Sequence, residues 1–85
     1  MQQPRHEVFA AIEGERAYQD GLGIDRTFSE GRHEVAGHLV MMDTYLKKAV
    51  WAWTSNPGNH QALHEIRKIA AIAVRCMEQH GAPQR

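Results

Sequence analysis

The chain has 85 residues, enough for one small domain over residues 1–85, but its core would be marginal if the chain stayed alone. Its ten basic and ten acidic side chains cancel at neutral pH, so no overall field draws it to DNA or to an anionic membrane, and neither partner is expected. The single cysteine, Cys76, excludes an internal disulfide and a multi-cysteine zinc site. With no long apolar run and no signal-peptide core in MQQPRHEVF, we expect a cytoplasmic protein.

The first predicted helix spans residues 5–20. Pro4 suits the first turn of a helix, where its missing N–H would have no partner. One line along this helix, at steps of three or four residues, carries Val8, Ile12, Glu15 and Gln19. A carboxylate and an amide that continue an apolar line form either a satisfied pair at the edge of the core or part of a ligand site.

A predicted loop over residues 21–32, GLGIDRTFSEGR, leads to a second predicted helix over residues 33–55. This helix has the strongest periodic apolar signal in the chain and is expected to bury the line Val35, Leu39, Met42, Leu46, Val50 and Trp53. Trp51 lies far round the helix from that line. It offers either an oligomer contact or a flat surface on which a base can stack.

The turn SNPGN precedes a third predicted helix over residues 60–80, with Asn59 as its N-cap and Gly81 as its C-terminal cap. Its apolar and small residues cover an arc of roughly 160°, which is wide for a helix with one neighbour. We therefore expect two neighbours, one of them from another subunit. The fold is predicted to be all-α, a three-helix antiparallel hairpin or bundle completed by homo-oligomerisation. A small monomeric hairpin with a wide core is the alternative.

The third predicted helix also carries the most basic surface of the chain. Arg67, Lys68 and Arg75 accompany His60 and His64, and with the helix N-terminus they can bind phosphate oxygens or simply remain solvated. The two histidines have the i, i+4 spacing of a metal-binding pair. Because the sequence has no HExxH motif and no obvious third ligand, no metal site is predicted.

Three polar residues, Glu34, His38 and Tyr45, share one edge of the second predicted helix. Glu34 and His38 form either a satisfied surface pair or one side of a pocket shared with Glu15. Tyr18 and Tyr45 provide rings that can form a flat wall for a base. The sequence shows no glycine-rich phosphate loop, no Ser-His-Asp order and no reactive Cys-His context, so no catalytic residue is predicted.

Three segments of the chain resemble those of a known group of proteins: ERAYQDG, EVAGHLVMMDTYLKKA and ALHEIRKIAAIAVRCMEQHGAPQR. They are similar to small proteins encoded by phages and prophages, a group related to the all-α nucleotide pyrophosphohydrolases of the MazG type. The resemblance covers nearly the whole chain and implies an all-α fold with a nucleotide pocket. Active members hold magnesium with a Glu-x-x-Glu and a Glu-x-x-Asp pattern, and neither spacing occurs in this sequence.

Three interpretations remain open, and the missing carboxylate patterns favour the first. In the first interpretation, the protein is a phage-encoded nucleotide-binding module that sequesters a nucleotide-derived signal of bacterial defence in the host cytoplasm. Alternatively, it is a MazG-like pyrophosphohydrolase of nucleoside triphosphates, which would require Mg²⁺, or a structural or regulator-binding helical protein. For the first, we predict that a nucleotide or cyclic nucleotide, with no other cofactor, contacts Glu15, Gln19, Tyr18, Glu34, His38, Tyr45, Arg67, Lys68 and Arg75.

Overall fold

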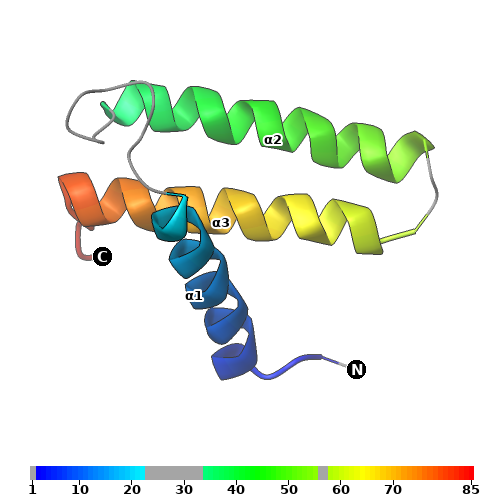
Figure 1. The fold of residues 1–85 in the computed structure, drawn as a ribbon, viewed down its shortest axis with the longest axis horizontal. Helices are drawn as coiled ribbons and strands as arrows, with labels where there is room; N and C mark the ends of the chain where they lie inside the picture. Colours follow the sequence, from blue (N-terminus) through cyan, green and yellow to red (C-terminus); the bar gives the residue numbers. More distant parts are fainter. Residues whose placement is uncertain (1, 23–33, 56–57) are drawn as a thin grey trace.

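The computed structural model describes three stretches of the chain, residues 2–22, 34–55 and 58–85. All regular structure in these stretches is α-helical, which confirms the all-α prediction. The helices in chain order are α1 (Arg5–Gly21), α2 (Val35–Ser55) and α3 (His60–His80), as Figure 1 shows. Each lies within two residues of its predicted bounds. The loop predicted over residues 21–32 falls, from residue 23 onward, outside the described residues.

The helix ends follow the local chemistry of their sequences. The carbonyl of Pro4 accepts the N–H groups of Glu7 at 3.0 Å and Val8 at 3.2 Å, so α1 starts directly after the proline. Asn59 occupies the N-cap of α3 as predicted, although its side chain makes no capping hydrogen bond. Gly81 ends α3 with a φ of +106° and donates its N–H to the carbonyl of Met77 at 2.8 Å.

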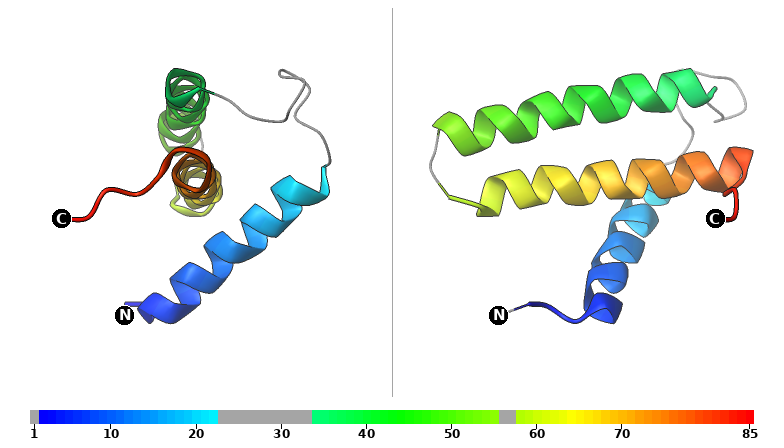
Figure 2. Two further views of the ribbon diagram at one scale, coloured as in Figure 1. Left: turned by 90° about the vertical axis from the view of Figure 1, so that its left-hand side faces the viewer. Right: turned by 180° about the vertical axis from the view of Figure 1, so that it is seen from behind.

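Two helices pack on α3, and both belong to the same chain. α2 and α3 form a long antiparallel hairpin, while α1 crosses α3 steeply on another side (Figures 1 and 2). Within the described residues, α1 makes its contacts with α3 and not with α2. The wide apolar arc of α3 therefore has two neighbours without a second subunit. The width of the arc alone therefore does not require a second subunit, and the homo-oligomer stays a prediction.

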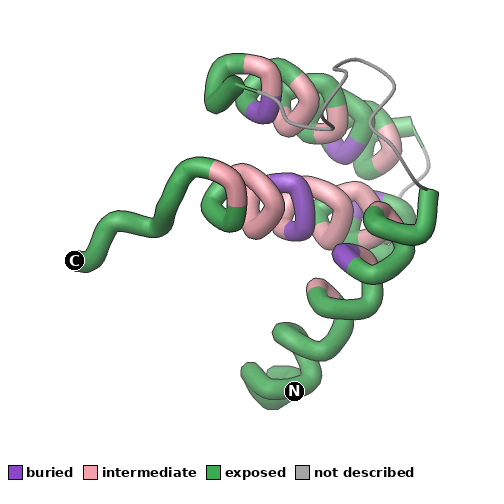
Figure 3. The backbone as a smooth tube through the Cα atoms, turned by 60° about the vertical axis from the view of Figure 1, so that its left-hand side comes forward, coloured by how far each residue is buried: buried purple, intermediate pink, exposed green. Residues whose placement is uncertain are grey.

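The core of the described chain is small. Its buried apolar residues are Ala49, Ala62, Ala71 and Ile72 (Figure 3). Two polar side chains, Arg16 and His38, are buried beside them, and His38 is fully enclosed. Among the described residues, Ile72 is thus the only large apolar side chain that is buried. An interior of this size gives limited hydrophobic stabilisation.

The apolar line predicted as the core face of α2 does not face α3. Val35, Leu39, Leu46, Val50 and Trp53 remain between 45% and 58% exposed. The buried residues of α2 are instead His38 and Ala49, on a line roughly 75° away on average, with Tyr45 half-buried between them. From this line, His38 contacts the His80 ring and Tyr45 contacts Lys68, both on α3. The apolar periodicity of α2 thus predicted which residues share a face, but not whether α3 covers that face.

Among the helices that the structure describes, none combines the length and the apolar character needed to cross a membrane.

Candidate functional site

A groove of about 390 Å³ lies between α1 and the first half of α3. We call it the α1–α3 groove, and its volume is within the range of about 300–1,000 Å³ that is usual for small-molecule sites. Apolar side chains form its wall: Val8, Ala11, Ile12, Leu63, Ile66 and Ala70. Its polar lining comes from Gln3, His60, His64 and Arg67. An apolar wall with a few polar groups at one side is the usual composition of a ligand site.

Arg67 is held from two directions at the edge of this groove. Its Nε donates to Glu15 Oε1 at 2.8 Å across the two helices, and its Nη1 lies 2.6 Å from His64 Nδ1. The Glu15 side chain is only 10% exposed, whereas that of Arg67 is 32% exposed. The guanidinium is therefore fixed in position and still reaches solvent, as a phosphate-binding group requires.

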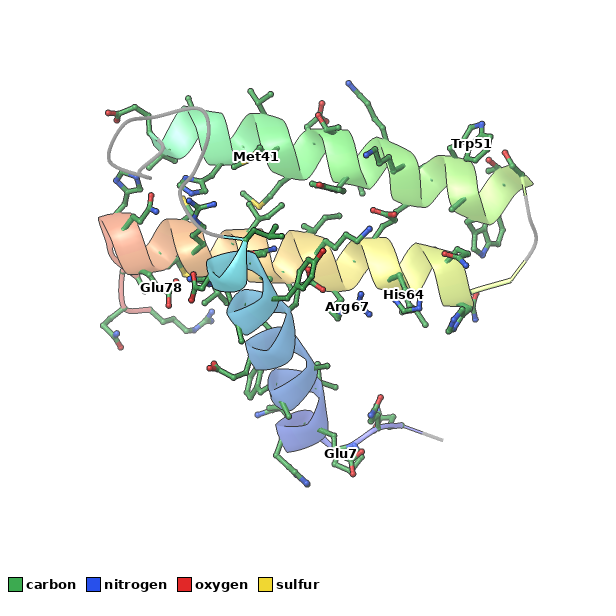
Figure 4. The ribbon with its side chains drawn as sticks, in the orientation of Figure 1. Glu7, Met41, Trp51, His64, Arg67 and Glu78 are labelled. Carbon is green, nitrogen blue, oxygen red and sulfur yellow. The ribbon has the colours of Figure 1, made fainter. Side chains whose placement is uncertain are left out.

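The two histidines beside Arg67 extend this arrangement along α3. A guanidinium has no acceptor, so Arg67 donates to His64 Nδ1, and a neutral His64 ring then carries its proton on Nε2. That nitrogen lies 3.1 Å from His60 Nε2, and the two rings meet edge to face at 4.5 Å. Figure 4 shows Arg67 and His64 together near the start of α3. The basic edge of the groove is thus a connected string that ends at the N-terminus of α3.

A second ion pair starts from the residue next to Glu15 and ties α1 to the C-terminal part of α3. Arg16 is buried, and its Nη2 and Nε lie 2.6 Å and 2.9 Å from Glu78 Oε1, with Nη1 3.0 Å from Asp20 Oδ1. Burial alone would lower the pKa of Arg16, but the hydrogen bonds to Glu78 and Asp20 outweigh it and raise that pKa above its ordinary value. Glu78 lies beside the C-terminal part of α1 in Figure 4. The sequence interpretation missed Arg16, whose only local signal is an acidic residue four positions later.

Gln19 lies on the same helix, half-buried, and its Oε1 is buried with no hydrogen-bond partner in the described part of the chain. Gln19 and Glu15 were predicted to share a line that continues an apolar stripe, and both are now placed on the partly covered side of α1. The ion pair with Arg67 accounts for the position of Glu15 on this side of α1. Gln19 does not line the α1–α3 groove.

Lys68 points to a different neighbour from Arg67, although the two are adjacent in sequence. Its Nζ lies 3.2 Å from Glu65 Oε1 and 5.6 Å from the centre of the Tyr45 ring on α2. Lys48 stands 4.8 Å over the same ring. Arg67 therefore serves the α1 side of α3 and Lys68 the α2 side. The single basic surface expected from the sequence is split between two interfaces.

The remaining predicted site residues are dispersed. His38 is buried in the hairpin, where its Nδ1 donates to the backbone carbonyl of Glu34 at 3.2 Å and its ring meets that of His80 edge to face at 5.9 Å. Glu34 and Tyr18 are exposed, and Arg75 is half-buried on α3. Of the nine predicted residues, the structure joins Glu15 with Arg67 and, separately, Tyr45 with Lys68.

Comparison of the chain with protein-family models, with curated proteins and with solved structures finds no match. Within residues 2–22, 34–55 and 58–85, no three histidine, cysteine, aspartate or glutamate side chains converge as a metal site.

Proposed function

We propose that the protein is a nucleotide-binding module and that its ligand occupies the α1–α3 groove. The observation that supports this most directly is the position of Arg67, which two neighbours fix at the edge of a cavity of about 390 Å³. A fixed guanidinium loses little conformational freedom on binding a phosphate. The apolar wall beside it can accept a nucleobase.

The start of α3 strengthens the phosphate end of this site. His60 is the first residue of the helix, so the unbonded N–H groups and the positive end of the helix dipole lie at the groove. His60, His64 and Arg67 add donors on the same side. Val8, Ile12 and Leu63 then face the less polar part of the ligand. We place the phosphates toward α3 and the base toward α1.

We further propose that binding serves to sequester a nucleotide-derived signal of bacterial defence, such as a cyclic nucleotide, by a phage-encoded protein. The resemblance to small phage proteins similar to the MazG type motivates this role, and Arg67, which Glu15 holds at the edge of the groove, is the group that would bind the phosphates. A homo-oligomer is part of the proposal, because the buried core of one copy is small. Sequestration requires that the ligand be released unchanged.

Calorimetry tests the proposal with mononucleotides, cyclic dinucleotides and ADP-ribose-derived signals as ligands. The Arg67→Ala variant should bind about ten- to hundredfold more weakly, in line with about 1.5–3 kcal/mol for a charge-assisted hydrogen bond. Lys68→Ala removes a neighbouring cation that faces α2, so it should bind as the wild type does. Thermal melting without ligand shows whether either variant is simply unfolded.

Each other outcome has a definite meaning. If no member of the panel binds the wild type, the nucleotide-binding proposal fails for those ligands. Equal affinity in Arg67→Ala and wild type would place the site elsewhere. Pyrophosphate release from nucleoside triphosphates with Mg²⁺ would favour the pyrophosphohydrolase, and a tight protein partner with no nucleotide would favour the regulator-binding alternative.

A further inference from the structure

One side of the α2–α3 hairpin presents a continuous apolar surface. α2 runs from left to right above α3 in Figure 1, so a rotation of roughly 75° past its α3-facing line leads toward the back of the hairpin. α1 lies on the front and lower side (Figure 2). The apolar line of α2 is therefore uncovered by α1. It consists of Val35, Leu39, Met42, Leu46, Val50 and Trp53.

α3 continues this surface beside α2. On this side of α3 lie Ile69, Ala73 and Met77, and Ile66 lies at the border with the α1–α3 groove, which it also lines. Ile66 and Met77 are 49% and 44% exposed, and Ile69 and Ala73 are half-buried. We call the two lines together the back face of the hairpin. Neither line contains a charged residue.

We propose that the back face binds a second copy of this chain, with the two α2 helices packed antiparallel across a two-fold axis. This rests on the homo-oligomer of the proposed function and assigns its interface and register. The described residues bury a small core, so burial against a partner would stabilise the chain. A second copy is the partner that is present wherever the chain is synthesised, and most soluble oligomers are homo-oligomers.

The size of the face agrees with a stable dimer. Seven of its large side chains are between 44% and 58% exposed in one copy. With the range of about 150–250 Å² for aromatic residues as an upper limit for each fully exposed side chain, the seven together present at most roughly 700 Å². A standard interface buries about 800 Å² on each partner. The half-buried residues of the face, Met42, Ile69 and Ala73, add part of the remaining area.

Charge and size select the antiparallel register. Asp43 and Lys47, 2.9 Å apart, border the middle of the α2 line. Antiparallel packing about this point places Asp43 of one copy near Lys47 of the other, twice, whereas parallel packing places like charges opposite each other. It also sets Val35 of one copy against Trp53 of the other, so that a small residue meets a large one.

Sedimentation or light scattering of matched variants tests the face. Leu39 and Val40 are neighbours on α2, 57% and 66% exposed, but only Leu39 belongs to the back face. Wild type and Val40→Glu should have twice the 9.6 kDa mass of the chain, while Leu39→Glu should give monomers or lose its helical signal on dilution. A wild-type monomer at high concentration overturns this inference and the proposed homo-oligomer together, and leaves nucleotide binding to calorimetry.

Cross-linking tests the register even if Leu39→Glu does not fold. In a Cys76→Ser background, the double variant Leu39→Cys, Val50→Cys should form covalent dimers, because antiparallel packing brings position 39 of one copy beside position 50 of the other. The two positions are about 16 Å apart within one helix, so they cannot join internally. Leu39→Cys alone should not cross-link. A cross-link in the Leu39→Cys variant would indicate parallel α2 helices. An oligomer in which neither variant cross-links would indicate that the two copies meet through another face. Either result overturns the proposed register but not the homo-oligomer.

Discussion

The two contacts of α3 are held by different means. α1 reaches α3 through the ion pairs Arg16–Glu78 and Glu15–Arg67, whereas α2 follows α3 along its length with small apolar residues and the buried His38. Ion pairs are directional and fix the crossing of α1, but desolvation cancels much of their free energy. Apolar burial has no direction and supplies most of the stability. α1 is thus accurately positioned rather than strongly bound, and the groove depends on few contacts.

The largest expected effect is on the hairpin side. Replacing Ile72 by Ala should lower the free energy of unfolding by about 3 kcal/mol, because it removes the one large apolar side chain in the buried core of the described chain. Urea unfolding at one protein concentration measures this. Val40→Ala, at a position 66% exposed, should change the free energy by about 0.5 kcal/mol or less. Equal losses in both variants would show that α2 and α3 are not held as described.

The α1 side should respond less to the loss of its most buried charged side chain, Arg16. Arg16→Met keeps the apolar stem and should cost about 2 kcal/mol, less than the 3–5 kcal/mol typical of a fully buried pair. The reason is that Glu78 and Asp20 are 54% and 69% exposed and can rehydrate. Hydrogen exchange should show faster opening of α1 with α2 unchanged. Arg5→Met, at an exposed position on α1, serves as control and should have no such effect.

Gln19 separates stability from binding on the same helix. Its Oε1 is buried with no hydrogen-bond partner among the described residues, so Gln19→Leu should stabilise the protein by about 1.5 kcal/mol. Gln61→Leu, at an exposed position, should change the melting temperature little. If Gln19→Leu is stabilised and also binds a nucleotide more weakly, the amide contacts the ligand. A loss of stability would mean that the amide is satisfied in solution.

The smallest effects come from two glycines and should have opposite signs. Gly14 lies inside α1, and an added Cβ meets nothing within 4 Å, so Gly14→Ala should stabilise by about 0.8 kcal/mol through helix propensity. Gly81 has a φ of +106° at the end of α3, so Gly81→Ala should destabilise by about 1 kcal/mol or slightly less. Thermal melting of both variants measures the signs, and a shared sign would contradict the assigned helix ends.

Helix positions were predictable from the sequence because they depend on local chemistry. Pro4, Asn59 and Gly81 mark ends through backbone geometry and unpaired N–H or C=O groups, and the apolar period marks the helices between them. These signals act within a few residues and need no knowledge of the tertiary fold. The predicted bounds therefore agree closely with α1, α2 and α3.

Rotation about a helix axis was not predictable in the same way. The apolar line of α2 is exposed because α2 turns His38 and Tyr45 toward α3, where the His38 ring meets that of His80 and the Tyr45 ring lies under Lys68. Whether the polar or the apolar residues of α2 face α3 depends on the contacts that α3 offers, which the sequence of α2 does not contain. The separation of Arg67 from Lys68 has the same origin, since adjacent residues diverge by about 100° and α3 has two neighbours. Of the nine residues predicted for the site, Glu15 and Arg67 lie side by side, whereas His38 lies apart from them in the hairpin, and the role of all three in binding stays a prediction.

Native mass spectrometry of the protein after incubation with the nucleotide panel tests the central proposal most directly. We expect a species of two chains that carries the added mass of a nucleotide, and the loss of that added mass, but not of the dimer, in Arg67→Ala. Lys68→Ala should keep both. A chain that stays at 9.6 kDa and carries no ligand from the panel would contradict the account.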